Sequence, residues 1–218
     1  MKKGLMGLII AGILFSFTNN SFSQNMKEIS PKKVEKTRIL KSNETNKEKF
    51  DKIDILKYQD YNKMLEEVKD IEDAEIYCTK IMKHAGQDAD KIMYGEEDYW
   101  ASFNQSFYLR LQDCDDGAIA AASLLYDNGF HPYFLDLDGK ESGHLVFLYK
   151  NEECKFGTIG INEKDCKRPK YKDIGKLVEE FNKDYENKFH SYRIIDASSI
   201  FPDAIHKEGN YKKTYQAL

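Results

Sequence analysis

The sequence has few of the residues and runs that define several common classes of protein. Only 4 of its 218 residues are proline and 13 are glycine, which argues against a low-complexity chain. The 33 basic and 37 acidic residues leave a formal net charge of −4, so the charge balance gives no sign of nucleic-acid binding. The apolar run at residues 4–17 is shorter than the roughly twenty residues of a normal membrane span. The length predicts one domain with an export or linker segment.

The N-terminus has the three parts of a secretory signal peptide. Lys2 and Lys3 precede the apolar run, and a polar stretch follows it. Small residues at Ser21 and Ser23 predict cleavage before Gln24. We therefore expect an exported protein, periplasmic or secreted; an uncleaved N-terminal anchor is the alternative. Residues 24–57 are mostly charged or polar and predict a flexible arm, which leaves residues 58–218 as the folded domain.

The folded part predicts helices first and a sheet afterwards. Apolar residues recur at helical spacing from Tyr58 to Met82, which indicates one broken helix or two, covering one side of the site. An alanine-rich helix that begins at Cys114 is apolar on most sides and should be central and buried, and Asn128-Gly129 ends it.

Several short strands are expected after that helix, at residues 133–135, 144–150, 155–161 and 191–195. A turn or surface loop is expected at 136–140 and a helix at 174–185. The short connections favour an antiparallel sheet, so the expected fold class is α+β.

Cys114 and His144 are the candidate catalytic pair. Cys114 stands at the start of its helix, where the helix dipole favours a thiolate, and His144 opens a hydrophobic strand about thirty residues later. A thiol and an imidazole in such positions are the minimal parts of a cysteine nucleophile and its base. The alternative is an inert buried thiol and an ordinary strand histidine; the two features together favour the catalytic interpretation.

Supporting roles are assigned to residues near this pair. Asn162, at the end of the strand that follows His144, is the candidate third catalytic residue, with Thr158 as second choice. An oxyanion would need the Cys114 N–H and one further donor. The candidates for that donor lie upstream: Gln112, Gln105 and Trp100. Trp100 is also expected to serve as a core anchor.

Three carboxylates flank the thiol: Asp113, Asp115 and Asp116. If they faced Cys114 they would raise its pKa, so we expect them to point away and to cap the helix. No cofactor is required on this interpretation. If a cation such as calcium binds, these three side chains are the expected ligands.

Three segments resemble the bacterial transglutaminase-like cysteine peptidases, a group of the transglutaminase-like superfamily with a papain-like core. They are Asp98-Tyr99-Trp100, Asp113-Cys114-Asp115-Asp116-Gly117-Ala118 and Gly143-His144-Leu145-Val146. The resemblance covers roughly residues 96–202, including 156–162 and 168–171. It implies that Cys114 is the nucleophile and His144 the general base.

The resemblance also implies an Asp or Asn after the strand that follows the histidine. Gly160 aligns near where many members carry Asp, and Asn162 is the nearest polar residue. Gln112 stands where glycine is expected before the Asp-Cys pair. In some relatives the acidic residues beside the cysteine bind calcium.

The function implied is an exported cysteine peptidase or amidase that forms a thioester on protein or cell-wall peptides. The expected partner is a protein or peptide substrate, with no nucleic acid and no membrane after signal cleavage. One alternative is a transglutaminase that passes the acyl group to a lysine amine. Another is a catalytically impaired binding module, and a weaker third is a domain tethered to a surface by its arm. If one disulfide forms while Cys114 stays free, Cys154 and Cys166 are the expected pair, with Cys78 a core residue. In a compartment that is not oxidising, all four cysteines are expected to remain thiols.

Overall fold

The computed structural model describes residues 55–86, 89–140, 142–186 and 188–212. The chain divides into two units, Met1–Lys32 and Lys33–Leu218, and all described residues belong to the second. The expected signal peptide and nearly all of the expected arm lie outside the described residues. The 3₁₀ helix η1 (Ile55–Tyr58) begins before the expected domain boundary at Tyr58. Throughout the described ranges, no helix combines the length and the apolar character that crossing a membrane requires.

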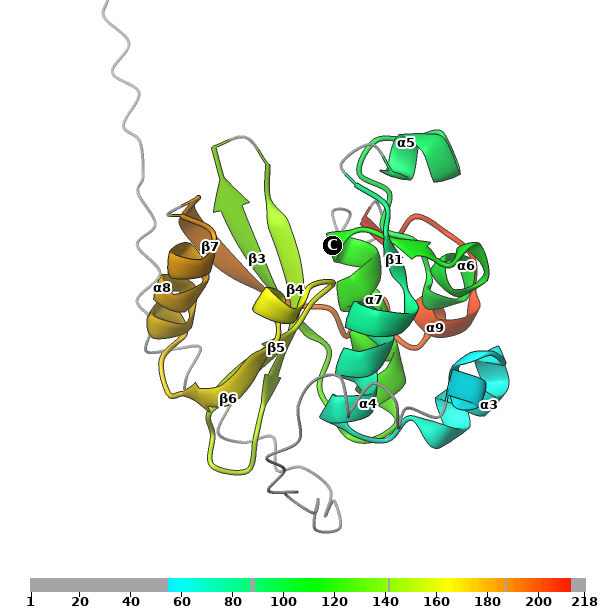
Figure 1. Ribbon diagram of the computed structural model, residues 1–218, viewed down its shortest axis with the longest axis horizontal. Helices are drawn as coiled ribbons and strands as arrows, with labels where there is room; N and C mark the ends of the chain where they lie inside the picture. Colours follow the sequence, from blue (N-terminus) through cyan, green and yellow to red (C-terminus); the bar gives the residue numbers. More distant parts are fainter. Residues whose placement is uncertain (1–54, 87–88, 141, 187, 213–218) are drawn as a thin grey trace, which may run out of the picture. The chain divides into compact units, whose positions relative to one another are not determined.

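Short helices make up one half of the domain (Figure 1). They are α3 (Tyr61–Glu67), α4 (Ile71–Ile76), the π-helix η2 (Tyr77–Ile81), α5 (Ala89–Tyr94), α6 (Phe103–Leu109) and α9 (Asp203–His206). Aspartates begin two of them, because the side chains of Asp60 and Asp70 accept hydrogen bonds from N–H groups of the first turn. The expected helical region before residue 83 is confirmed, and it is broken into several pieces.

The helix α7 (Cys114–Tyr126) is the centre of this half. Every residue from Asp115 to Leu125 is buried, as the alanine-rich sequence predicts. Helices α4, α6 and α9 pack on α7, and its other side packs on strand β4. Gly117 is required for this packing, since a Cβ at that position would lie 2.4 Å from the Ile161 side chain. A two-stranded parallel ribbon of β1 (Lys83–His84) and β2 (Leu111–Gln112) leads into α7.

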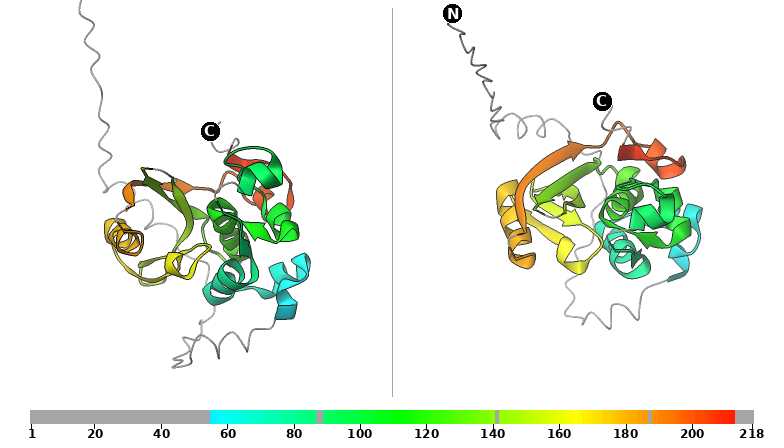
Figure 2. Two further views of the ribbon diagram at one scale, coloured as in Figure 1. Left: turned by 45° about the horizontal axis from the view of Figure 1, so that its top comes forward. Right: turned by 90° about the horizontal axis from the view of Figure 1, so that it is seen from above.

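The other half is a five-stranded antiparallel sheet in the order β6-β5-β4-β3-β7. Its strands are β3 (Tyr133–Gly139), β4 (His144–Lys150), β5 (Phe156–Ile159), β6 (Lys167–Tyr171) and β7 (Phe189–Asp196). Helix α8 (Ile174–Asp184) covers the face of the sheet opposite α7 (Figures 1 and 2). The α+β class and the antiparallel sheet are thus confirmed.

Two local predictions in the sheet are wrong. Residues 136–140 do not form a turn, because β3 continues to Gly139 and pairs with β4 on one side and β7 on the other. Leu137 is buried, while Asp136 forms an ion pair with Arg193 at 2.6 Å. Strand β6 was not expected, since it contains little apolar surface. Its Pro169 is tolerated because β6 is an edge strand.

The predicted disulfide is also wrong. Cys154 is exposed in the turn before β5, and Cys166 lies beyond the other end of that strand. Four extended residues span roughly 13 Å, whereas the Cα atoms of a disulfide lie within about 7 Å of each other. Cys78, Cys114, Cys154 and Cys166 are all free thiols, and Cys78 is a buried core residue as expected.

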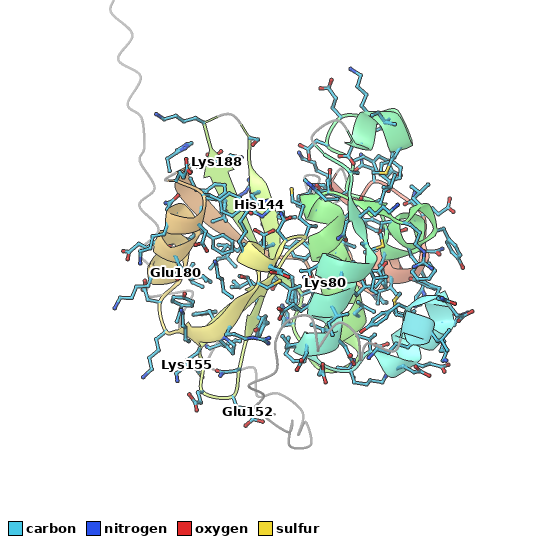
Figure 3. The ribbon with its side chains drawn as sticks, viewed as in Figure 1. Lys80, His144, Glu152, Lys155, Glu180 and Lys188 are labelled. Carbon is cyan, nitrogen blue, oxygen red and sulfur yellow. The ribbon has the colours of Figure 1, made fainter. Side chains whose placement is uncertain are left out.

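Ion pairs join the two halves. Lys80 of η2, labelled in Figure 3, pairs with Glu163 of the 3₁₀ helix η3 (Glu163–Asp165), which follows β5. Arg168 of β6 lies 3.4 Å from Glu75 of α4. Since these side chains are partly exposed, each pair contributes at most about 1 kcal/mol, and the buried packing of α7 on β4 does more to hold the halves together.

Candidate active site

A cleft of about 940 Å³ lies where α7 begins and β4 starts, and both Cys114 and His144 line it. Trp100 forms another part of its wall and is also buried in the core, so its expected role as a core anchor is confirmed, while its role as an oxyanion donor stays a prediction. The remaining lining comes from several elements and includes Asp90, Asp136, Asn162, Lys164, Tyr185 and Tyr192.

Local sequence places the candidate nucleophile and base against each other. Asp113 is the N-cap of α7, and its side chain accepts a hydrogen bond from the Asp116 N–H at 3.5 Å, which fixes Cys114 as the first helical residue. The N–H of Leu145, the residue after His144, interacts with the Cys114 sulfur. Figure 3 shows His144 at the end of β4 that faces α7. The predicted pair therefore meets in one cleft.

Asp165 is the residue that pairs with His144. Its Oδ1 lies 3.0 Å from His144 Nε2, and the aspartate is fully buried. The two groups are close enough for an ion pair, although the ring N–H is not aligned for a hydrogen bond of good geometry. Its Oδ2 accepts hydrogen bonds from the backbone N–H of Asn162 at 3.0 Å and the side-chain amide of Asn162 at 3.3 Å. The Tyr185 hydroxyl donates to Oδ1. Burial alone would raise the pKa of Asp165, but the contacts with His144, Tyr185 and Asn162 together hold it below its ordinary value.

The assignment of Asn162 as third catalytic residue is therefore corrected. Asn162 lines the cleft, but its amide holds Asp165 and not the histidine. Thr158 does not contact His144 either, since its hydroxyl donates to the Asp165 backbone carbonyl at 2.6 Å. Both residues fix the segment that carries the carboxylate.

Gly160 explains why the carboxylate comes from outside the strand. A Cβ at Gly160 would lie 2.5 Å from Asp165 Cβ and 2.9 Å from the Val146 side chain. The space beside His144 that a strand side chain would occupy is thus filled by Asp165 of η3. The signal in the sequence was the pair Asn162 and Asp165, which cap η3 reciprocally in the spacing of a capping box.

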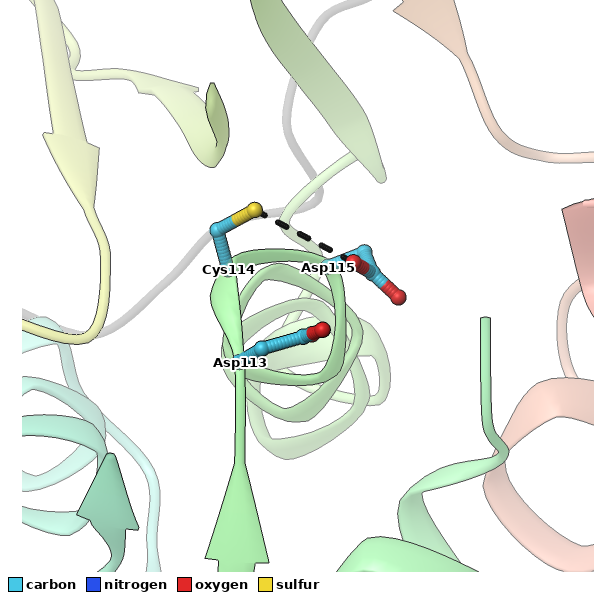
Figure 4. Close-up of side chains that lie close together, drawn as sticks. All are labelled: Asp113, Cys114 and Asp115. Carbon is cyan, nitrogen blue, oxygen red and sulfur yellow. Dashed lines mark hydrogen bonds between the residues drawn. The ribbon is translucent and has the colours of Figure 1, made fainter. Parts of the chain in front are cut away.

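The flanking carboxylates do not all point away from the thiol. Asp113 caps the helix as expected, but Asp115 Oδ1 lies 3.9 Å from the Cys114 sulfur (Figure 4). Burial raises the pKa of the Cys114 thiol well above its usual value, and the charges of Asp115 and Asp113 raise it further. The Leu145 N–H offsets only part of this effect. These surroundings of Cys114 favour the neutral thiol.

A second group of carboxylates lies behind the first. Oxygens of Asp90, Asp113 and Asp116 lie within 4.8 Å of one another. Burial, followed by the charge of Asp113, raises the pKa of Asp90 to about 6 and that of Asp116 well above its usual value. Among the described residues, four buried oxygens make no hydrogen bond of good geometry: both carboxylate oxygens of Asp116, Asp90 Oδ1 and Asp115 Oδ2. The backbone N–H groups of Ala101 and Asp113 still interact with the Asp116 carboxylate, and the Asp113 side chain interacts with Asp90 and Asp115. Nothing in the sequence pattern of α5 indicated Asp90.

Two of the three predicted oxyanion donors are engaged elsewhere. The Gln105 side chain takes part in the capping box of α6, and its amide donates to the Tyr99 hydroxyl. The Gln112 amide donates to the Cys78 carbonyl at 2.5 Å and is buried away from the cleft. Gln105 and Gln112 are therefore corrected to structural roles, because their donors already have acceptors. Trp100 is the one candidate of the three that lines the cleft.

No known family model matches this chain, and a search among curated proteins finds no match to it. The geometry of the site therefore carries the functional argument.

Proposed function

We propose that this protein is a transglutaminase-like cysteine hydrolase, a peptidase or amidase with a papain-like core. The observation that carries the proposal is the contact between His144 and buried Asp165 in the same cleft as Cys114. A central helix that begins with the nucleophile and packs on a sheet that carries the base agrees with such a core. The substrate class proposed is an amide bond in proteins or cell-wall peptides.

The contact of His144 with Asp165 supports one direction of proton transfer. Nε2 faces Asp165, so Nδ1 is the nitrogen that takes the proton of the Cys114 thiol. The sulfur attacks the substrate carbonyl carbon, and the Cys114 N–H at the helix start can donate to the oxyanion. His144 returns the proton to the leaving nitrogen, the C–N bond breaks, and a thioester remains. Water then attacks the thioester carbonyl with His144 as base, and the C–S bond breaks. The carboxylic acid is released as product, and the proton from His144 restores the Cys114 thiol.

A calcium ion is part of the proposal, because the residues present fit one. Asp90, Asp113 and Asp116 supply a cluster of carboxylate oxygens, and several of these oxygens are buried and make no hydrogen bond of good geometry among the described residues. Oxygen ligands of this kind are the ones that calcium prefers. Bound there, the ion would supply positive charge that offsets the carboxylates beside Cys114. The group of Asp113, Cys114 and Asp115 is a poorer candidate, since a metal on the sulfur would occupy the nucleophile.

Export is proposed on the N-terminal pattern, which lies outside the described residues. We propose a periplasmic or secreted protein that begins at Gln24 after cleavage and does not bind nucleic acid. N-terminal sequencing of the protein recovered from the medium or the periplasm tests the cleavage site, and a chain that keeps Met1 would refute it.

A second candidate function is a binding module that kept the fold. The observation that favours it is the contact of Asp115 with the thiol, which opposes thiolate formation. A transglutaminase differs from the main proposal only in its acceptor, and incorporation of a labelled primary amine into a peptide would identify it.

The experiment that tests the main proposal is the rate of Cys114 alkylation by iodoacetamide across pH, in calcium and in chelator. Adducts are assigned by peptide mass spectrometry, because the exposed Cys154 also reacts. We expect rapid reaction near neutral pH in calcium, slower reaction in chelator, and loss of the rapid reaction in His144→Ala. Equal and slow rates in all three would reject the hydrolase and favour the binding module.

A further inference from the structure

Tyr185 belongs to neither the cysteine motif nor the histidine motif, yet it reaches the site. It follows α8, which lies on the face of the sheet opposite α7, and its side chain lines the same cleft as Cys114. Its hydroxyl donates to Asp165 Oδ1. That oxygen is the one that lies 3.0 Å from His144 Nε2.

The ring of Tyr185 also packs beside the imidazole. The centroids of Tyr185 and His144 are 5.5 Å apart, and Phe189 lies 6.2 Å from His144 in a nearly parallel arrangement. Lys164 Nζ lies 3.6 Å from the centre of the tyrosine ring. Burial, followed by the hydrogen bond to Asp165, raises the pKa of Tyr185, so its hydroxyl remains a donor at any working pH.

We propose that Tyr185 is a positioning residue of the Cys114–His144–Asp165 site. Asn162 fixes only Oδ2 of the carboxylate, and the Tyr185 hydroxyl fixes Oδ1 in the orientation that faces His144. The ring limits the rotation of the imidazole and keeps Nδ1 directed toward the thiol. This inference rests on the proposed function and deepens it, since Tyr185 acts through Asp165 and His144 and not on the substrate.

The test compares Tyr185→Phe with Tyr61→Phe by site-resolved alkylation of Cys114, in calcium throughout, the condition in which the wild type is expected to react rapidly. Both variants keep the aromatic ring and lose one hydrogen bond of a tyrosine hydroxyl. In Tyr185→Phe the lost bond is the one to Asp165, and in Tyr61→Phe it is the one to the Ile205 carbonyl in the helical half. At about pH 6.5 we expect Tyr185→Phe to react about tenfold more slowly than the wild type, as for the loss of one charge-assisted hydrogen bond. On the alkaline branch, where hydroxide forms the thiolate, it should match the wild type.

Tyr61→Phe should show the wild-type alkylation rate of Cys114 both at about pH 6.5 and on the alkaline branch. Its melting temperature should fall about as far as that of Tyr185→Phe. A wild-type rate for Tyr185→Phe at the lower pH would overturn the inference. An equal loss at both ends of the profile would also overturn it, since that result indicates only a structural role. His144→Ala separates the two proposals: if it keeps rapid reaction near neutral pH, the hydrolase proposal itself fails.

Discussion

Two histidine–aspartate pairs in this protein have the same length and different surroundings. His144 and Asp165 lie 3.0 Å apart, with side chains 10% and 0% exposed. His131 and Asp196 also lie 3.0 Å apart, but their side chains are 30% and 52% exposed. The distance between the partners therefore does not identify a site. Burial of the aspartate distinguishes the first pair from the second, since donors hold both carboxylates: Asn162 and Tyr185 hold Asp165, and Ser198 holds Asp196.

The second pair even has a hydroxyl beside it. Ser198 Oγ lies 3.1 Å from His131 Nε2, the same ring nitrogen that faces Asp196. A general base needs one nitrogen for the nucleophile and the other for the carboxylate. At His131, Asp196 and Ser198 both contact Nε2, so this arrangement lacks the geometry of a general base and is that of a surface turn. At His144, Asp165 lies beside Nε2, so the other nitrogen, Nδ1, is the one that the proposed mechanism assigns to the thiol.

The sharpest test of this comparison replaces each histidine with alanine. His144→Ala should lower hydrolysis of a responsive peptide by roughly 10² to 10⁴, the range that general acid–base catalysis supplies. His131→Ala should leave the rate within about twofold, because its pair is exposed and outside the cleft. Steady-state kinetics of the two purified variants decide the matter. A comparable loss in both would mean that the exposed pair takes part in the reaction.

Replacing each aspartate with asparagine should separate the pairs by stability. In Asp165→Asn, an NH₂ group turned toward Asn162 would face its two N–H donors, and one turned toward Tyr185 would require that hydroxyl to accept and no longer donate. We expect Asp165→Asn to lower the free energy of unfolding by about 1 to 3 kcal/mol, the cost of unsatisfied buried groups. Asp196→Asn should change it by about 0.5 kcal/mol or less. Urea unfolding measures both, and equal effects would contradict the contrast in burial.

The space that Gly160 leaves is a requirement of the buried pair alone. Gly160→Ala brings a Cβ to 2.5 Å from Asp165 Cβ, so the carboxylate must move, and we expect a loss of about 1 to 3 kcal/mol. The alkylation rate of Cys114 near neutral pH should fall with it. Gly209→Ala is the matched control, since its new Cβ would make only ordinary contact, at 3.9 Å from the Tyr211 ring. A Gly160→Ala protein with wild-type stability and reactivity would show that Asp165 does not need this space.

The sequence predicted some parts of this arrangement well, for physical reasons. A helix apolar on most sides must be buried, so α7 and Cys114 at its start could be located from the pattern. A hydrophobic strand preceded by Gly143 located His144 in the same way. The carboxylate beside His144 was missed because Asp165 belongs to a short 3₁₀ turn, and its proximity to His144 depends on the path of the chain after β5.

The carboxylates at the thiol were misjudged for a similar reason. Their spacing on the helix predicts a cap, but whether Asp115 turns toward the sulfur depends on the groups packed around it. Asp90 joins the cluster from a separate helix, so only the tertiary structure reveals a site of several carboxylates. The sequence shows that carboxylates flank Cys114, but it does not show which of them lie close to one another or to the sulfur.

The smallest expected effect concerns acid stability. The pKa of Asp165 and that of Asp196 are both lowered: in each case burial opposes the shift, and contacts outweigh it, chiefly with His144 for Asp165 and with Ser198 for Asp196. A lowered pKa in the folded protein gives stability that is present above the unfolded value, about 3.9, and is lost as pH falls through the folded value. The stability gap between wild type and Asp165→Asn should therefore narrow as pH falls below about 4.

Asp196 is half-exposed, so solvent screens its contacts and Asp196→Asn should follow the wild-type curve closely at every pH. Melting temperatures measured between about pH 5 and pH 2.5, a range that spans the carboxylate titration, give the stability difference between the wild type and each asparagine variant. If the gap for Asp165→Asn stays constant over that range, its cost comes from packing and not from the charge of Asp165, and the buried pair would differ from the exposed one by its surroundings alone.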